Sequence, residues 1–334
     1  MGMNGPEYTE LPERAAKIMA NFLPPEDKIA ERMKQFAHVQ PRAEDKEGDT
    51  EIIDGVTFTH HFVDAPGDYE MVRWHYVECG NREAEKIVFL HGIPDSWYEW
   101  SHQMAAFAGD YHCIGVDLKG YGQSDKKGGN YQHEAASEQL WTMLQQIGVT
   151  QFNVVTHDRG TVQADFIAAN HPESVLRYAR GEQHLYNFHP SLAPQGDLFM
   201  DAPYNGMLDD PKRLVLWAYT WLTTRPIPDE EMERVIQEFS YDGIRKAVPR
   251  YFNSSTFRQE WLARRDRLMA AWKCPVMILQ GHDSKTQPRE FYDDVERHMP
   301  NARSVTVRII PGGHFWSKES PKESIEAIRE LLKM

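Results

Sequence analysis

The spacing of apolar and polar residues predicts a helical arm at the start of the chain. Residues 1–50 are rich in charged side chains, and the segments 13–23 and 26–39 carry apolar residues at about every third or fourth position. This spacing is typical of amphipathic helices. A polar stretch from residue 40 to residue 51 follows the second segment. We expect residues 1–50 to form a helical pair that packs on the main domain or on a second subunit.

From residue 52 the pattern changes to that of a sheet. Segments 55–63 and 71–79 are rich in β-branched and aromatic residues, which predicts two antiparallel strands. The runs "KIVFL", "YHCIGV" and "FNVV" are short and mostly apolar, as expected for parallel strands buried on both faces. Helical spacing separates these runs. The alternation predicts an α/β fold with a mostly parallel sheet and flanking helices.

The strand pattern stops after Glu182 and returns near residue 273. The intervening part shows helical spacing in three stretches, residues 210–224, 228–239 and 257–272. Strand character resumes in "CPVMILQGHD" and "SVTVRIIPGGHF". We therefore predict an α/β core made of residues 51–182 and 273–334, interrupted by a helical cap, residues 183–272.

The net charge and the cysteine content limit the kinds of molecule that the protein is expected to bind and the compartment in which it is expected to work. The formal charge is −13, from 37 basic and 50 acidic residues, which argues against nucleic acid and anionic membranes as partners. Cys79, Cys113 and Cys274 lack paired spacing, so we expect no disulfide framework, no zinc site and a reducing, cytoplasmic compartment. Neither a secretory signal nor a membrane-spanning run is expected. The expected partners are a small-molecule substrate and water, and the arm makes a homodimer plausible.

An acidic residue stands at the corner between an apolar strand and a helix. The segment "FNVVTHDRG", residues 152–160, predicts a nucleophile elbow with Asp158 in the nucleophile position. Gly160 keeps the tight-turn role, while Thr156 replaces the first small residue of the usual Gly-x-Ser-x-Gly form. The dipole of the following helix favours negative charge there, and an ionised carboxylate can attack carbon. The alternative is that Asp158 only caps the helix.

Two further motifs favour the nucleophile. "HGIPDSWYEW" follows a predicted strand, and there the backbone N–H of Ile93 can pair with that of Arg159 as an oxyanion hole. The alternative is an ordinary strand-to-helix loop. His314 follows a strand and two glycines near the end of the chain, where a base fits the order nucleophile, acid, histidine. Most other histidines, including His60, His61 and His298, are interpreted as surface or core residues.

With these motifs the chain resembles the aspartate-nucleophile branch of the α/β-hydrolase family, which contains epoxide hydrolases and dehalogenases. The resemblance covers roughly residues 55–334, and its carriers are "HGIPDSWYEW", "DLKGYGQSD", "VVTHDRG" and "PGGHF". The resemblance implies a triad acid in one of two places. Glu182 lies 24 residues beyond Asp158, whereas Asp283 follows the strand "PVMILQ". We favour Glu182 and keep Asp283 as the alternative.

The resemblance also implies residues of the substrate site. Caps of this family carry tyrosines that donate a proton to the opening epoxide oxygen, and the matching segments point to Tyr219 and Tyr251. The alternative for each is an aromatic side chain in cap packing. Substrate-binding positions are expected at His91 and at three tryptophans: Trp97, Trp217 and Trp221.

The resulting hypothesis is a cofactor-free and metal-free epoxide hydrolase that forms an ester on Asp158. A haloacetate or haloalkane dehalogenase is the alternative enzyme. Haloalkane dehalogenases usually have Asn and Trp where this chain has Ile93 and Arg159, which weakens that version. Arg159 is compatible with a haloacetate dehalogenase. However, Val162 and Ala218 stand where such enzymes usually have a second Arg and a halide-binding His. Outside enzymes, the same fold can serve as a small-molecule receptor.

Overall fold

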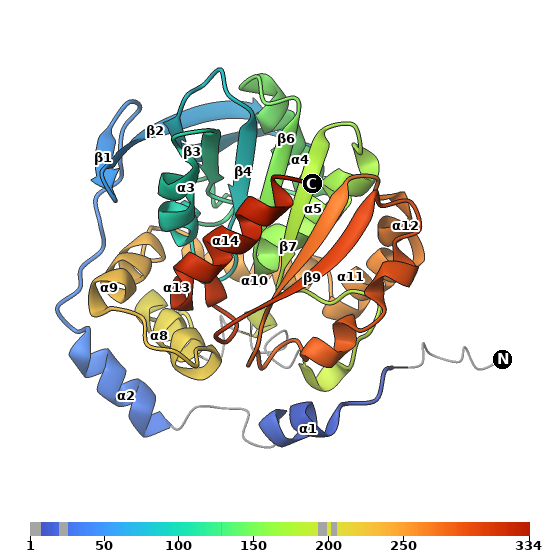
Figure 1. Cartoon of the computed structure of the whole chain (residues 1–334). Helices are drawn as coiled ribbons and strands as arrows, with labels where there is room; N and C mark the ends of the chain where they lie inside the picture. Colours follow the sequence, from blue (N-terminus) through green and yellow to red (C-terminus); the bar gives the residue numbers. More distant parts are fainter. Residues whose placement is uncertain (1–7, 20–25, 128, 193–198, 202–205) are drawn as a thin grey trace.

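The computed structural model describes residues 8–19, 26–127, 129–192, 199–201 and 206–334 (Figure 1). Within these residues, nine strands form one mixed sheet in the order β1-β2-β3-β5-β4-β6-β7-β8-β9. The strands are β1 Thr50–Ile53, β2 Val56–Pro66, β3 Met71–Gly80, β4 Lys86–Leu90, β5 His112–Val116, β6 Phe152–Thr156, β7 Val175–Gly181, β8 Pro275–Gly281 and β9 Ser304–Ile310. Strands β5, β4, β6, β7, β8 and β9 run parallel, whereas β1, β2 and β3 pair antiparallel with their neighbours. The predicted fold class is confirmed.

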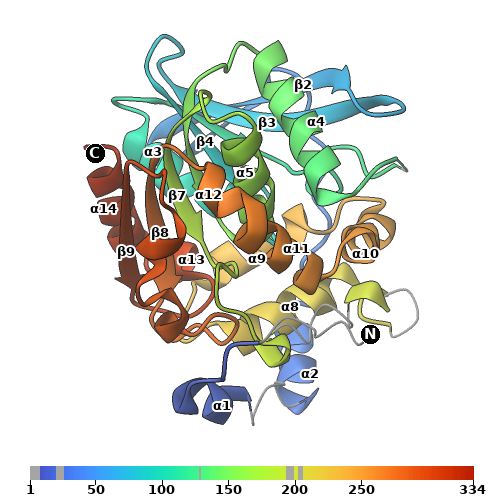
Figure 2. The same ribbon diagram turned by 90° about the vertical axis from the view of Figure 1, so that its right-hand side faces the viewer.

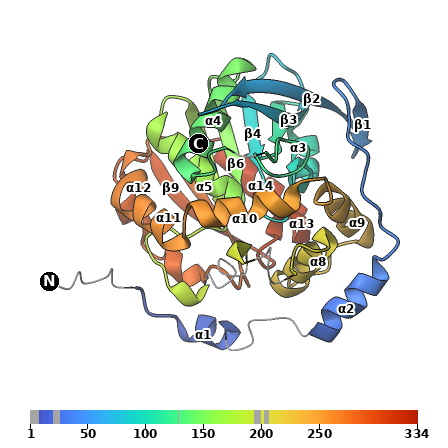
Figure 3. The same cartoon turned by 180° about the vertical axis from the view of Figure 1, so that it is seen from behind.

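Helices cover both faces of the sheet because successive strand residues point to opposite sides. Val88 and Leu90 of β4 belong to the core under α4 (His133–Gln146) and α5 (Asp158–Asn170). Ile87 and Phe89 instead pack with α3 (Ser101–Phe107) and α14 (Pro321–Leu331). Figure 2 shows α14 on one side of the sheet and α4 and α5 on the other, and Figure 3 shows the second face from behind. The continuously apolar runs are therefore strands buried on both faces.

Between residues 183 and 272 the described residues form helices and connecting loops, and none of them belongs to a strand. The helices are η2 (Pro190–Leu192), α8 (Pro211–Leu222), α9 (Asp229–Glu238), α10 (Ile244–Ser254), α11 (Phe257–Ala263), the π-helical turn η3 (Arg264–Leu268) and α12 (Met269–Ala271). In Figure 1, α8 and α9 lie below the sheet. Helix α10 was not expected, and it contains Pro249, a residue that removes one helical hydrogen bond. None of the helices in the described part of the chain has the length and apolar character needed to span a bilayer.

The N-terminal arm packs on the helical segment of its own chain. It contains α1 (Glu13–Met19) and α2 (Glu26–Gln35), and α2 lies against α8. The ammonium group of Lys212 on α8 donates to the carbonyls of Phe36 and Val39 at 2.8 and 3.0 Å. Farther upstream, the ring of Tyr8 packs on Trp261 with ring centroids 5.9 Å apart. The arm therefore contacts both ends of this segment.

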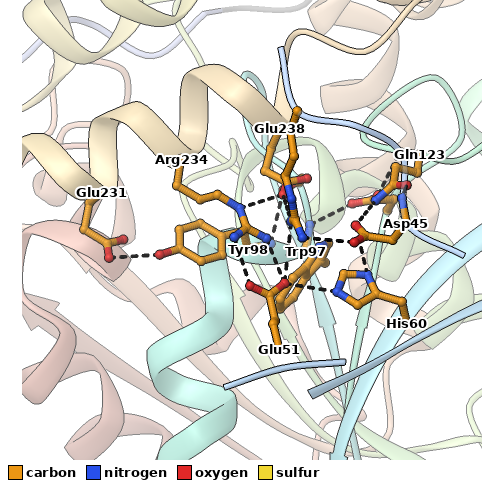
Figure 4. Close-up of polar contacts among 12 residues, drawn as sticks. Asp45, Glu51, His60, Trp97, Tyr98, Gln123, Glu231, Arg234 and Glu238 are labelled. Atoms are coloured by element: carbon orange, nitrogen blue, oxygen red, sulfur yellow. Dashed lines mark hydrogen bonds and ion pairs between the residues drawn. The ribbon is translucent and has the colours of Figure 1, made fainter. Parts of the chain in front are cut away.

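An ion-pair cluster joins the arm, α9 and the sheet (Figure 4). Arg234 on α9 donates to Glu51 at 2.8 and 2.9 Å and to Glu238 at 2.7 Å. Arg42 of the arm donates to Glu238 at 3.2 Å, and His60 on β2 lies 3.0 Å from Glu51. Removing one partner would leave a poorly hydrated charge behind, so a cluster of this kind favours one arrangement of its elements. We call these residues, Arg42, Glu51, His60, Arg234 and Glu238, the arm cluster.

Candidate active site

Asp158 stands at a strained corner between β6 and α5. Its φ angle is +45°, in the left-handed region that residues with a Cβ rarely adopt. A Cβ on Gly160 would lie 2.4 Å from the carbonyl oxygen of Leu90, so only glycine fits two residues later. The N–H groups of His157 and Gly160 donate to the carbonyls of Leu90 and His91 at 3.0 and 2.9 Å. The end of β4 thus fixes the corner and holds the carboxylate clear of the sheet.

The Asp158 carboxylate meets two donors. Oδ1 accepts the backbone N–H of Ile93 at 3.2 Å, and Oδ2 accepts the side-chain amide of Gln183 at 3.4 Å. Gly92 permits this approach, because a Cβ there would lie 2.6 Å from the Asp158 Cβ. Arg159 follows in the first turn of α5. The N–H of Ile93 therefore points at one carboxylate oxygen of Asp158.

His314 lies between two carboxylates. Its Nε2 is 3.8 Å from Oδ2 of Asp158, and its Nδ1 is 3.0 Å from Oε2 of Glu182. Glu182 is held in turn by the N–H of Gly281 at 2.8 Å and by the hydroxyl of Ser284 at 2.7 Å. His314 and Glu182 are both buried. The three residues form a line in which Glu182 can fix the tautomer of the imidazole that faces Asp158.

Asp283 does not belong to this line. Its side chain is 52% exposed and lies 2.8 Å from the ring of its neighbour His282. The loop after β8 turns its later residues inward instead, and Thr286 Oγ1 lies 3.1 Å from Nδ1 of His314. The geometry thus supports Glu182 and not the alternative acid.

Sequence reasoning missed three polar residues that contact Asp158, Glu182 or His314: Gln183, Ser284 and Thr286. All three follow the carboxyl ends of β7 or β8. Ends of neighbouring parallel strands meet at one edge of a sheet, where α/β proteins bind ligands. Their position at these ends is the signal that could have identified them.

A mostly apolar cavity opens above Asp158 and His314. Its described lining consists of Ile93, Pro94, Asp158, Arg159, Phe199, Leu214, Trp217, Ala218, Trp221, Leu222, Phe252, Phe257, Thr286 and His314. Trp217 and Trp221 stand at this wall, with ring centroids 4.9 Å apart. Few polar groups in an apolar wall are typical of small-molecule sites. No group of three or more potential metal ligands occurs among the residues that the structure describes.

Neither tyrosine singled out from the sequence belongs to the described lining. The hydroxyl of Tyr219 donates to Asp95 at 2.5 Å, and its ring stacks on Phe315. The hydroxyl of Tyr251 accepts the side-chain amide of Gln163 at 3.2 Å. Each hydroxyl is therefore engaged in a buried contact, and the geometry does not support either as a proton donor to a ligand. This outcome agrees with the alternative of cap packing.

His91 and Trp97 also lie outside the described lining. Nδ1 of His91 donates to the carbonyl of Gly92 at 2.8 Å, while Nε2 accepts the N–H of Leu118 at 3.0 Å. Trp97 packs edge-on against His60, with ring centroids 5.6 Å apart. Both side chains therefore make contacts within the fold, and neither reaches the described lining of the cavity.

A buried ion pair between His157 and Glu99 supports the backbone at His314. Nδ1 of His157 lies 2.9 Å from Oε1 of Glu99, and Nε2 donates to the carbonyl of His314 at 2.9 Å. Burial lowers the pKa of His157, but the Glu99 carboxylate outweighs this effect and raises the pKa to about 9. The charged imidazole thus ties the backbone of His314 to the residue that precedes Asp158.

Replacing His157 by glutamine should lower the free energy of unfolding by about 3 kcal/mol near pH 6, judged from the rise of its pKa from 6.5 to about 9. Because the folded-state pKa is raised, this stabilisation is fully present below pH 6.5 and is lost as the pH rises through about 9. Urea unfolding of both proteins at several pH values between 6 and about 9.5 should therefore show a shrinking difference. A difference that is constant over this range would contradict a charged His157.

Comparison with known proteins agrees with the fold. A family model described as alpha/beta hydrolase fold matches residues 86–321. Epoxide hydrolase 4 of Mus musculus is 32% identical over 276 residues, which cover 75% of this chain and 73% of that protein. Epoxide hydrolase 1 of Caenorhabditis elegans is 35% identical over 281 residues, covering 78% and 68%. The solved structure "Epoxide hydrolase CorEH without ligand" shares the fold, with a TM-score of 0.67 at 20% identity over 83% of this chain and 98% of that one.

The chain therefore belongs to the α/β-hydrolase fold family, whose model spans most of its length. Within this family it is an epoxide hydrolase-like enzyme, because several curated relatives that match most of the chain are epoxide hydrolases.

Proposed function

We propose that the enzyme hydrolyses an epoxide to a diol through a covalent ester on Asp158. The observation that carries this proposal is the line Glu182–His314–Asp158, with spacings of 3.0 and 3.8 Å, at the floor of an apolar cavity. The similarity to epoxide hydrolases supports the choice of substrate. A dehalogenase would use the same two half-reactions, but no contact in the cavity favours a halide over an epoxide oxygen.

In the first half-reaction, Oδ2 of Asp158 attacks an epoxide carbon. A new C–O bond forms, the ring C–O bond breaks, and the released oxygen takes up a proton from solvent, which balances the proton that Asp158 returns to solvent in the second half-reaction. The product is an alkyl ester whose carbonyl oxygen is Oδ1, the atom that already accepts the N–H of Ile93. Holding the carboxylate and the carbon in place converts a bimolecular step into a unimolecular one.

In the second half-reaction, Nε2 of His314 takes a proton from water, and the resulting hydroxide attacks Cγ of the ester. Negative charge develops on Oδ1, where the N–H of Ile93, together with that of Arg159, can stabilise it. The bond between Cγ and the alkyl oxygen then breaks, and the leaving oxygen, Oδ2, takes the proton from Nε2 of His314. The diol leaves with Oδ2, and Asp158 keeps the oxygen from water and loses its remaining proton to solvent. Glu182 holds the N–H at Nδ1 so that Nε2 faces the water.

This route makes a definite isotopic prediction. A single turnover in ¹⁸O-water, tested with a panel of uncharged epoxides and halogenated acids, should label the Asp158 side chain and leave the diol unlabelled. Peptide fragmentation would locate the label, and Asp165 in the same helix should stay unlabelled as an internal control. Label that enters the diol first would show direct attack by water and would overturn the ester route. Turnover of halogenated acids alone would favour the dehalogenase.

We also propose that the enzyme works in a reducing compartment such as the cytoplasm. Cys79 and Cys113 stand opposite each other on β3 and β5, and both are free thiols, as is Cys274. Facing thiols that remain unpaired suit a reducing environment.

A further inference from the structure

The Arg159 side chain borders the cavity next to Asp158, and its charge is already paired. Both terminal nitrogens of its guanidinium donate to Glu260, with three contacts between 3.0 and 3.1 Å. Each side chain is only 2% exposed. This fork-to-fork geometry is the one in which an arginine would bind a ligand carboxylate. Glu260 therefore occupies the position that such a ligand would take.

Glu260 is held in its charged form. It belongs to α11, and besides Arg159 it faces Nε2 of His133 at 3.0 Å and the guanidinium of Arg264 at 3.7 Å. Burial raises the pKa of Glu260, but Arg159, followed by His133 and Arg264, outweighs burial and lowers the pKa to about 2. The pair therefore stays ionised wherever the enzyme is folded and active.

Aromatic rings enclose the guanidinium. The Arg159 carbon Cζ lies 4.9 Å from the ring centre of Phe252 and 5.3 Å from that of Phe257, and both rings also line the cavity. Cation–π contacts of this kind favour keeping the arginine where it is. With Arg159 neutralised by Glu260, the carboxylate of Asp158 is the remaining acidic group in the described lining of the cavity, and it repels anions.

We propose that Glu260 sets the charge selectivity of the active site: by occupying Arg159, it reserves the cavity for uncharged substrates and rejects small carboxylates. This inference rests on the proposed function and names its substrate class. A carboxylate could bind Arg159 only by displacing Glu260, which would then be a buried charge without its main partner, a costly state. Glu260 is thus a specificity residue that acts through Arg159.

The test uses two ligands of nearly equal shape, phenylacetamide and phenylacetate, whose binding is measured by calorimetry. The wild-type enzyme should prefer the amide by about tenfold or more, a ratio typical of one like-charge juxtaposition. In Glu260→Gln the preference should shift toward the anion by at least about tenfold, because Arg159 becomes available to the carboxylate. Glu238→Gln is the matched control: Glu238 is equally buried and pairs with Arg234, but it lies away from the cavity, so the wild-type ratio should remain.

A double variant, Arg159→Gln with Glu260→Gln, removes both charges and should keep the wild-type preference even if the single variant is unstable. An unchanged ratio in Glu260→Gln, a shifted ratio in the double variant, or a wild-type enzyme that binds the anion as well as the amide would each overturn the inference. Failure of the wild-type enzyme to bind the amide at all would overturn it too. Ligand binding does not require formation of the ester, so these outcomes are independent of the isotope experiment. Label on Asp158 together with no charge selectivity would contradict this inference and leave the proposed function intact.

Discussion

Replacing His314 by glutamine should stop the enzyme after its first half-reaction and leave the substrate bonded to Asp158. The attacking carboxylate and the N–H of Ile93 are unchanged in this variant, so the ester still forms. The group that takes a proton from water is missing, so steady-state turnover should fall by about 10³-fold or more. Intact-protein mass spectrometry after mixing with an epoxide should show one added substrate mass.

A matched control is His112→Gln. His112 is also buried and also lies 3.0 Å from a glutamate, Glu78, but it stands at the start of β5, away from the cavity. This variant should turn over normally and accumulate no adduct. If His314→Gln lost activity without forming an adduct while Asp158→Asn also lost activity, His314 would be needed before ester hydrolysis, and its assignment as the base would be wrong.

Replacing Glu182 by glutamine should lower kcat by about 10²–10⁴-fold, because the amide no longer holds the tautomer of His314 that accepts a proton from water. The ester should accumulate here as well. Its level should be lower than in the His314 variant, because residual hydrolysis removes part of it. Asp283→Asn makes the same chemical change at the exposed alternative position, and turnover should stay within about twofold of wild type, as is usual for surface substitutions. Steady-state kinetics of the two variants side by side decide the matter. A large loss in Asp283→Asn with little effect in Glu182→Gln would reverse the assignment.

The parts of the fold that could be predicted are those set by local patterns. Runs such as "KIVFL" and "FNVV" are mostly apolar because both faces of β4 and β6 are covered, and this was visible in the sequence. Helix α10 was not visible, since Pro249 interrupts the usual signal. The direction in which the arm packs was not visible either, because contacts such as Lys212 with Phe36 join residues far apart in the chain.

The same distinction applies to the site. Asp158 and Ile93 could be placed because each belongs to a short strand–turn motif, and His314 because a strand and two glycines precede it. Glu182 and Asp283 could not be separated with certainty, since the choice depends on how the loops after β7 and β8 turn. The contact of Tyr219 could not be foreseen for a related reason: its hydroxyl donates to Asp95, a residue 124 positions away, and no local pattern indicates that contact.

The arm cluster has a consequence for protein engineering. Arg42 and Glu51 come from the arm and its junction with the sheet, yet they hold Arg234 and Glu238 of α9. If residues 183–272 were exchanged for the matching segment of a relative, the charged side chains on both sides of the junction would lose their ion-pair partners. In a functional chimera, residues 26–51 and the exchanged helices should therefore come from the same protein.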